Sequence, residues 1–167
     1  KNTGCCRFVF NYYLNKRIEI YEQTKETFNY YSCAKDLTQL KKQDDFKWLK
    51  DVDSTSLQNS LNNLDTAFKN FFEGFSASRN VGYPKFKSKH NPVQSYTSKN
   101  NNCSIRLVNN RIQLPKLGLV KIRLSKNVNG KILSATVSKN RCNQYYCAIN
   151  FDQSDFVPFE HTGCAIG

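Results

Sequence analysis

The apolar residues of this chain repeat with two different periods, and the change between them limits the possible folds more than any other feature. In the first half they recur every three or four residues, as in Leu57, Leu61 and Leu64, which places them on one face of a helix. In the second half they alternate with polar residues, as in LVKIRL (119–124), which is typical of a strand with two different faces. The sequence therefore predicts an α+β protein in which helices come first and strands follow.

The first half predicts a bundle of three to four helices. The first expected helix has an apolar face formed by Phe10, Leu14, Ile18 and Tyr21. A second helix is expected to begin after Ser32, whose side chain can cap it. The third is expected to begin at a cap formed by Asp53 or Ser54 and to end near Gly74. Trp48 is expected to anchor the preceding link to the core.

The second half predicts about five short antiparallel strands with turn signals between them, a pattern typical of a small β-barrel or barrel-like sheet. The candidate strands are CSIRLV (103–108), RIQL (111–114), LVKIRL (119–124), KILSATVSK (131–139) and QYYCAINF (144–151). In LVKIRL, Lys121 and Arg123 lie on one face, opposite Val120 and Ile122. We therefore expect one face of this strand to pack on the core and the other to present cations.

These patterns divide the chain into parts of different character. Residues 1–75 are predicted to form the helical domain, and residues 96–160 the β-barrel. Residues 76–95 hold Gly82, Pro84 and several serines without a strong period, so they are predicted to form a basic connector between the two.

Charge is distributed unevenly along the chain, whose net charge is +12. Residues 1–78 carry 11 basic and 10 acidic side chains, whereas residues 79–151 carry 14 basic and no acidic ones. So long a stretch without a carboxylate indicates a polyanionic partner, above all nucleic acid. A membrane surface is the weaker alternative, because the cations do not lie on an amphipathic helix. No segment resembles a secretory signal or a membrane span.

Residues suited to catalysis or metal binding are scarce. The chain has seven cysteines but no CxxC pair, and its only histidines are His90 and His161, so we expect buried free thiols in a reducing cytoplasm rather than a zinc site. Metal-ion chemistry on nucleic acid needs converging carboxylates, which the basic half lacks, and the sequence has no P-loop. The chain as given is therefore predicted to be non-catalytic, without a cofactor or a small-molecule substrate.

Five motifs in a fixed order add a family resemblance. They are GCCRFVFNYYLNKRIEIY (4–21), YYSCAKDLTQLKK (30–42), WLKDVDSTSLQNSLNNLDTAFKNFF (48–72), GYPKFKSK (82–89) and RIQLPKLGLVKIR (111–123). Together they resemble the N-terminal half of TnpB, also called OrfB, the RNA-guided DNA nuclease of bacterial insertion sequences that is related to the type V CRISPR effectors. The resemblance covers nearly the whole chain.

The resemblance implies a layout. The helical part resembles the recognition (REC) domain, called a helix-turn-helix in older descriptions, and the strand part resembles the wedge (WED) barrel. The family's first wedge strand would precede Lys1. A RuvC-like nuclease domain, with its divalent metal and a zinc-binding insert, would follow. Residues 161–167 look like its start, and its first catalytic aspartate would come after Gly167, so we expect a chain cut just before its catalytic domain.

The resemblance also implies contacts to DNA. Guide pairing reads the target sequence, whereas the protein reads a short flanking DNA motif, at the boundary between the REC and WED parts. Tyr30 and Gln58 match positions with that role, and Gln can make a bidentate contact to adenine. Ser54 and Thr55 occupy the neighbouring turn and match less closely. From the residues alone, an ordinary exposed position near the helix N-terminus is the stronger alternative for Gln58, and Tyr30 can equally be a core or rim aromatic.

Basic side chains complete the candidate site. In GYPKFKSK the lysines Lys85, Lys87 and Lys89 alternate along an extended strip, so they are expected to face one way and each can neutralise a phosphate. A solvated loop is the plain alternative. Phe86 can stack on a base or ribose, or can instead anchor the connector onto the bundle. Several further RNA-phosphate contacts are expected among Lys116, Lys121, Arg123, Lys131, Lys139 and Arg141. Lys99 is a further candidate contact to nucleic acid.

The combined expectation is the nucleic-acid-binding portion of a transposon-associated, RNA-guided DNA endonuclease, which holds guide or scaffold RNA and helps to recognise a target-flanking DNA motif. Its partners would be that RNA and the target DNA in the bacterial cytoplasm, with no membrane. One rival is a self-standing, sequence-specific DNA-binding transcriptional regulator derived from the same family. The other is an enzyme, if the chain belongs to a longer polypeptide with a RuvC carboxylate set downstream.

Overall fold

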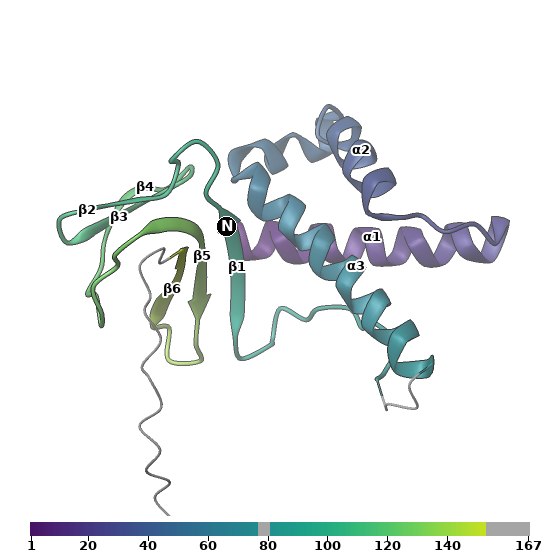
Figure 1. Ribbon diagram of the computed structural model, residues 1–167. Helices are drawn as coiled ribbons and strands as arrows, with labels where there is room; N and C mark the ends of the chain where they lie inside the picture. The colour runs from purple at the N-terminus through teal and green to yellow at the C-terminus, as the bar shows by residue number, and fades with distance from the viewer. Residues whose placement is uncertain (77–80, 153–167) are drawn as a thin grey trace, which may run out of the picture.

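The computed structural model describes residues 1–76 and 81–152, in which helices come first and strands follow (Figure 1). The helices are α1 (Asn2–Thr24), α2 (Tyr30–Leu40), the 3₁₀-helix η1 (Asp44–Asp51) and α3 (Ser54–Ser76). The strands are β1 (Gln94–Lys99), β2 (Arg106–Val108), β3 (Arg111–Leu114), β4 (Gly118–Lys121), β5 (Lys131–Lys139) and β6 (Tyr145–Asp152). The predicted α+β class is confirmed. Residues 153–160 of the expected barrel and the expected domain start at 161–167 lie outside the described residues.

The helices share one core, built mainly by α1 and α3. Three leucines of α3 are fully buried, as their spacing predicts: Leu57, Leu61 and Leu64. The buried side chains of α1 are Cys5, Cys6, Val9, Phe10, Tyr13 and Leu14. The expected apolar face of α1 is only partly right, because Phe10 and Leu14 are buried while Tyr21 is 55% exposed. The first half of α1 packs against both α3 and β1, whereas its last turns extend away from the sheets in Figure 1.

The start of α2 and the link before α3 differ from the expectation. The side-chain oxygen of Asn29 accepts a hydrogen bond from the Ser32 N–H at 3.0 Å and caps the helix, so α2 begins at Tyr30 rather than after Ser32. The link before α3 is η1, in which Leu49 is fully buried. Trp48 is 37% exposed and packs edge-on against an aromatic ring of α1. Leu49 therefore anchors the link more deeply than Trp48.

The start of α3 is capped by a side chain that makes two hydrogen bonds. The Asp53 carboxylate accepts hydrogen bonds from the N–H groups of Thr55 and Ser56, both at 3.2 Å, as the sequence predicts for this position. At its other end α3 continues to Ser76, past the expected stop at Gly74. A glycine inside a helix lowers its stability without ending it.

The strands form two three-stranded antiparallel sheets, in the orders β1-β5-β6 and β2-β3-β4. Within residues 94–152, the strand pairing found consists of these two sheets, and no closed barrel is found among these strands. Strand β1 is not predicted by patterning, because QSYTSK is mostly polar, yet its Tyr96 and Ser98 alternate inward and are buried. Tyr96 belongs to the helical core, so β1 joins the first sheet to α1 and α3.

A second, smaller core lies under the strands and consists of Ile105, Ile112, Leu114 and Ala135. The expected strand 119–124 is shorter in the structure, because β4 ends at Lys121. The expected apolar face of this strand is wrong, since Val120 is 39% exposed and all of β4 is exposed. The reason is that β4 is an edge strand, with β3 as its one strand partner among the described residues. Ile122, just past the strand, packs against the second core instead.

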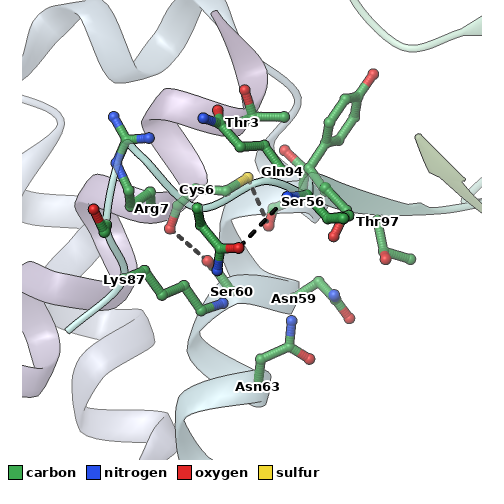
Figure 2. A pocket seen from close by; sticks show the side chains of 15 residues that line it. Thr3, Cys6, Arg7, Ser56, Asn59, Ser60, Asn63, Lys87, Gln94 and Thr97 are labelled. Carbon is green, nitrogen blue, oxygen red and sulfur yellow. Dashed lines mark hydrogen bonds between the residues drawn. The ribbon is translucent and has the colours of Figure 1, made fainter. Parts of the chain in front are cut away.

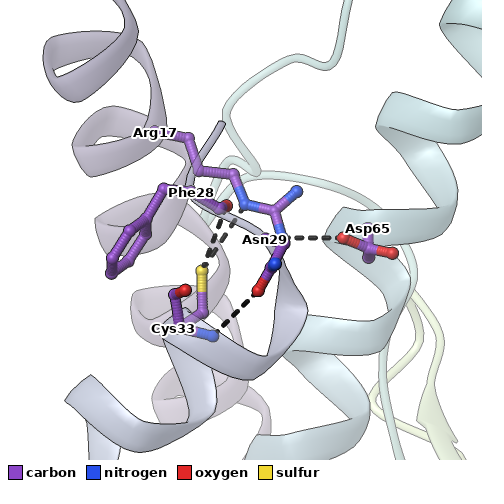
Figure 3. A network of polar contacts seen from close by, with 6 residues as sticks. Arg17, Phe28, Asn29, Cys33 and Asp65 are labelled. Carbon is purple, nitrogen blue, oxygen red and sulfur yellow. Dashed lines mark hydrogen bonds and ion pairs between the residues drawn. The ribbon is translucent and has the colours of Figure 1, made fainter. Parts of the chain in front are cut away.

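A polar network fixes the three α-helices to one another (Figure 3). The guanidinium of Arg17 on α1 donates to the Asp65 carboxylate on α3 at 2.8 Å and to the Cys33 sulfur on α2 at 3.5 Å. Cys33 in turn donates to the Phe28 carbonyl at 3.8 Å. Burial raises the pKa of the Cys33 thiol, while the neighbouring Arg17 lowers it. The network therefore holds the bundle in register and leaves the Arg17 side chain largely covered.

Candidate nucleic-acid interface

The ion pairs of the described residues all lie in residues 1–73. They are Lys1–Asp51, Lys16–Asp36, Arg17–Asp65, Asp44–Lys47 and Lys69–Glu73. Within the described part of the chain, no cation from residues 81–152 forms an ion pair, although Lys116 lies close enough to Asp51 to help lower the pKa of that carboxyl. The acid-free stretch therefore leaves most of its positive charge without an ion-pair partner, which is the condition for attracting a polyanion.

The basic connector is pinned to α1 by one side chain. The Asn11 amide donates to the Lys87 carbonyl at 2.9 Å, and its oxygen accepts from the Lys87 N–H at 2.8 Å. The Lys87 ammonium lies 4.0 Å from the centre of the Phe10 ring, and its partial burial lowers the pKa of Lys87. All three lysines are exposed, but Lys85 and Lys89 have no ring contact or ion pair to the described residues. The three lysines of the strip are thus not equivalent.

Tyr83, which sequence reasoning did not single out, anchors the other end of the connector. Its ring packs edge-on against Phe68 at 5.6 Å and against Phe71 at 5.3 Å, both on α3. Phe86 is 56% exposed and makes no ring contact with the described residues. The ring that anchors the connector onto the helical bundle is therefore that of Tyr83 and not that of Phe86. The exposed Phe86 ring remains accessible for stacking.

A polar cavity of about 240 Å³ lies where α1, α3, the connector and β1 meet (Figure 2). Arg7 and Lys87 bring positive charge to it, and none of its 15 lining residues is acidic. Asn59 and Asn63 project into it from successive turns of α3. Neither the sequence patterns nor the family resemblance points to this cavity, because its walls come from three stretches of the chain that are far apart in sequence.

The predicted DNA-contact residues at the start of α3 play different parts. Ser54 and Gln58 are exposed. The Thr55 hydroxyl donates to the Asp53 carboxylate and accepts from the Lys99 N–H at 3.2 Å. Thr55 thus connects the cap of α3 to the end of β1, and the structure gives it a positioning role. Ser54 and Gln58 remain available for a ligand.

Tyr30 lies apart from this group. It is half-buried against the helical core, and its ring meets that of Tyr31 at 5.5 Å. One turn after Tyr30, Cys33 is linked through the polar network to Asp65 on α3. Asp65 is seven residues after Gln58, which is about 10 Å along the axis of α3. The structure therefore does not place Tyr30 beside Gln58, although sequence reasoning grouped them.

Lysines from three segments gather near the start of α3. A second cavity, of about 300 Å³, is lined by Lys41, Lys50 and Lys116, and its other polar lining residues are Ser54 and the acidic Asp53. Lys41 and Lys50 were missed from the sequence, because the acids of the helical half balance them in a count along the chain. Lys121 on β4 and Arg123 just after it are exposed, as predicted for cations that meet a ligand.

The six described cysteines are all free. Cys5, Cys6 and Cys33 are buried, as expected, whereas Cys103 and Cys142 are exposed, contrary to the expectation. Burial raises the pKa of Cys6 to about 11. Among the described residues, no group of three or more His, Cys, Asp or Glu side chains could hold a metal ion.

Comparison with known proteins connects this geometry to a family. The helix-turn-helix domain of OrfB proteins from IS605 matches residues 1–26, which span α1. InsQ of Escherichia coli (strain K12), by its name a candidate RNA-guided DNA endonuclease, is 33% identical over 166 residues, covering 99% of this chain and 39% of InsQ. A candidate RNA-guided DNA endonuclease of Streptomyces pristinaespiralis is 27% identical over 170 residues, covering 100% of this chain and 40% of that protein.

The structure is that of an α+β protein whose helical part has nearly balanced charge and whose strand part carries cations without ion-pair partners. Together with the matches to known proteins, this shows that the chain belongs to the OrfB (TnpB) family and corresponds to the N-terminal part of its members. It spans about 40% of the length of the curated relatives it matches. In the described residues, no helix has the length and apolar character needed to cross a membrane.

Proposed function

We propose that the chain is the nucleic-acid-binding portion of a transposon-associated, RNA-guided DNA endonuclease. It would hold guide or scaffold RNA and help to recognise a DNA motif beside the target. The observation that carries the proposal is the run from residue 79 to 151, with 14 basic and no acidic side chains. The relatives named as RNA-guided DNA endonucleases support it.

The two ligands are assigned to different surfaces. RNA phosphates are assigned to the exposed cations of the connector and strands, which are Lys85, Lys89, Lys121 and Arg123. The DNA motif is assigned to the start of α3, where Gln58 is exposed and has no hydrogen bond to the described residues. Lys99 and Lys116 lie near this start and would contact the DNA backbone there.

Catalysis is assigned elsewhere. DNA cleavage would belong to the part of the relatives that this chain does not match, with a divalent metal bound in that part. The portion described here would need no cofactor and would act by binding alone, in the cytoplasm of a bacterial cell.

Charge removal on the strands tests the proposal. Lys121→Ala and Arg123→Ala should each reduce the slope of log K against log salt for RNA by about 1, since each cation neutralises one phosphate. Lys35→Ala is the matched control, because Lys35 is an exposed cation on α2 without an ion pair. Equal slopes for all three variants and the parent protein would contradict the assignment of RNA to the strands.

A DNA-binding regulator is the second candidate function, and the helix-turn-helix match over residues 1–26 favours it. This function requires tight, sequence-specific binding of duplex DNA in the absence of RNA. A binding series with the terminal DNA of the transposable element, with and without its RNA, separates the two candidates.

A further inference from the structure

The cavity between α1, α3, the connector and β1 has an unusual balance of charge. Arg7 and Lys87 line it, and neither has an acidic partner among the described residues. Lys87 is exposed as a residue, but its ammonium lies 4.0 Å from the centre of the Phe10 ring, which partly shields this charge from water and lowers the pKa of Lys87. A cation taken partly out of water without a counter-ion is unfavourable, and an anion that enters the cavity would relieve this.

The amide side chains of the cavity fall into two groups. The amides of Asn91 and Gln94 are occupied, since each hydrogen-bonds the backbone of the connector. Those of Asn59 and Asn63 form no hydrogen bond to the described residues, and Figure 2 shows both side chains on the α3 wall. They stand four residues apart and thus share one face of the helix. Each offers a donor and an acceptor, the combination that reads the edge of a nucleobase.

The size of the cavity limits what can enter. Its volume of about 240 Å³ lies just under the range typical of small-molecule sites. The cavity is open on one side, but its volume is too small to admit a base pair of a double helix. An unpaired nucleotide, whose base is free to turn away from its strand, can enter.

From these features we propose that the cavity binds one unpaired nucleotide of a nucleic-acid strand, with its phosphate at Arg7 and Lys87 and its base at Asn59 and Asn63. This inference rests on the proposed function. It adds a binding site for a single nucleotide and specifies that this nucleotide is unpaired. The phosphate supplies the missing counter-ion, and the amides give the site a preference among bases.

A matched pair of substitutions on α3 tests the inference. Asn63→Asp keeps the size of the side chain but replaces the amide donor with a carboxylate, which repels phosphate and only accepts hydrogen bonds. Asn62→Asp makes the same charge change on the adjacent exposed residue, which does not line the cavity. The probes are short A, C and U homopolymers as RNA, their A, C and T counterparts as DNA, and a blunt duplex of equal length.

We expect Asn63→Asp to weaken binding of the preferred single strand about tenfold or more, since one base contact carries about that much discrimination. Asn62→Asp should change the affinity less than about twofold, as is usual for a solvent-exposed site. The parent protein should prefer one homopolymer and should bind the duplex more weakly than that strand. Circular dichroism checks that both variants are folded.

Three results would overturn the inference and leave the proposed function standing. They are equal losses for the two variants, equal affinity for all homopolymers, and duplex binding as tight as that of the best single strand. If the parent protein binds no nucleic acid at all, the proposed function fails as well. Comparison of the RNA and DNA arms shows which kind of strand supplies the nucleotide.

Discussion

The side chain of Asn11 should control the position of the basic connector. Its amide makes two hydrogen bonds to the backbone of Lys87, at 2.9 and 2.8 Å, across 76 positions of sequence. Asn11→Ala removes both bonds at once. The connector would then be held at this point only by the Lys87 ammonium on the Phe10 ring.

The expected size of the effect follows from the two bonds. A hydrogen bond in a protein contributes about 0.5–1.5 kcal/mol net, so the free energy that favours the closed connector should fall by about 1–3 kcal/mol. Because 1.4 kcal/mol is a factor of ten, the open population should rise about five- to 150-fold. The effect is local, since Asn11 does not belong to the buried core.

Limited proteolysis with trypsin measures this opening, because the connector contains Lys85, Lys87 and Lys89. Cleavage there follows the open population when opening is fast relative to cutting. Asn15→Ala is the matched control, since Asn15 lies one turn along α1 and, among the described residues, its side chain bonds only Glu19 of the same helix, at 2.6 Å. If Asn11→Ala and Asn15→Ala are cut at the same rate, the amide does not hold the connector and the reasoning fails.

Three further predictions concern the core, a helix cap and the thiols. Leu61→Ala should lower the free energy of unfolding by about 2–5 kcal/mol in urea, because Leu61 is fully buried; a loss below that range would mean that α3 is loosely packed. Asp53→Ala should lower it by about 0.5–2 kcal/mol, whereas Asp53→Asn should keep most of the cap, and equal losses would contradict the capping role. At mildly alkaline pH a thiol reagent should modify Cys103 and Cys142 first, as seen by mass spectrometry, because the raised pKa of Cys6, about 11, keeps that thiol protonated and burial shields it. Early modification of Cys6 would refute this order.

Elements whose burial follows a single period could be predicted from the sequence. The leucines of α3 face one core, and strands β3 and β5 coincide with the predicted segments 111–114 and 131–139. Helix α1 was predicted as a helix, but its buried side chains were predicted only in part, namely Phe10 and Leu14, because it packs on two sides and Cys5 and Tyr13 extend its buried surface. Strand β1 was missed because it is buried through one aromatic and one serine in a polar sequence.

The candidate site was predictable in composition but not in arrangement. The count of cations and the absence of acids are properties of the sequence. The contact of Asn11 with Lys87 and the anchoring of the connector by Tyr83 depend on how distant segments meet. The same holds for Lys50 near the start of α3. Such contacts produce no recognisable pattern in the sequence, because the residues that flank each partner along the chain do not determine them.

Binding of nucleic acid across a salt series tests the central claim most directly. The ligands are the RNA transcribed from the end of the transposable element, an unrelated structured RNA of equal length, and duplex DNA. We predict that log affinity falls by about 0.7–0.9 per log unit of salt for each phosphate contact, and that a preference for the element's RNA persists near physiological salt. Equal, salt-labile binding to all three ligands, or tight binding of duplex DNA without RNA, would contradict the account.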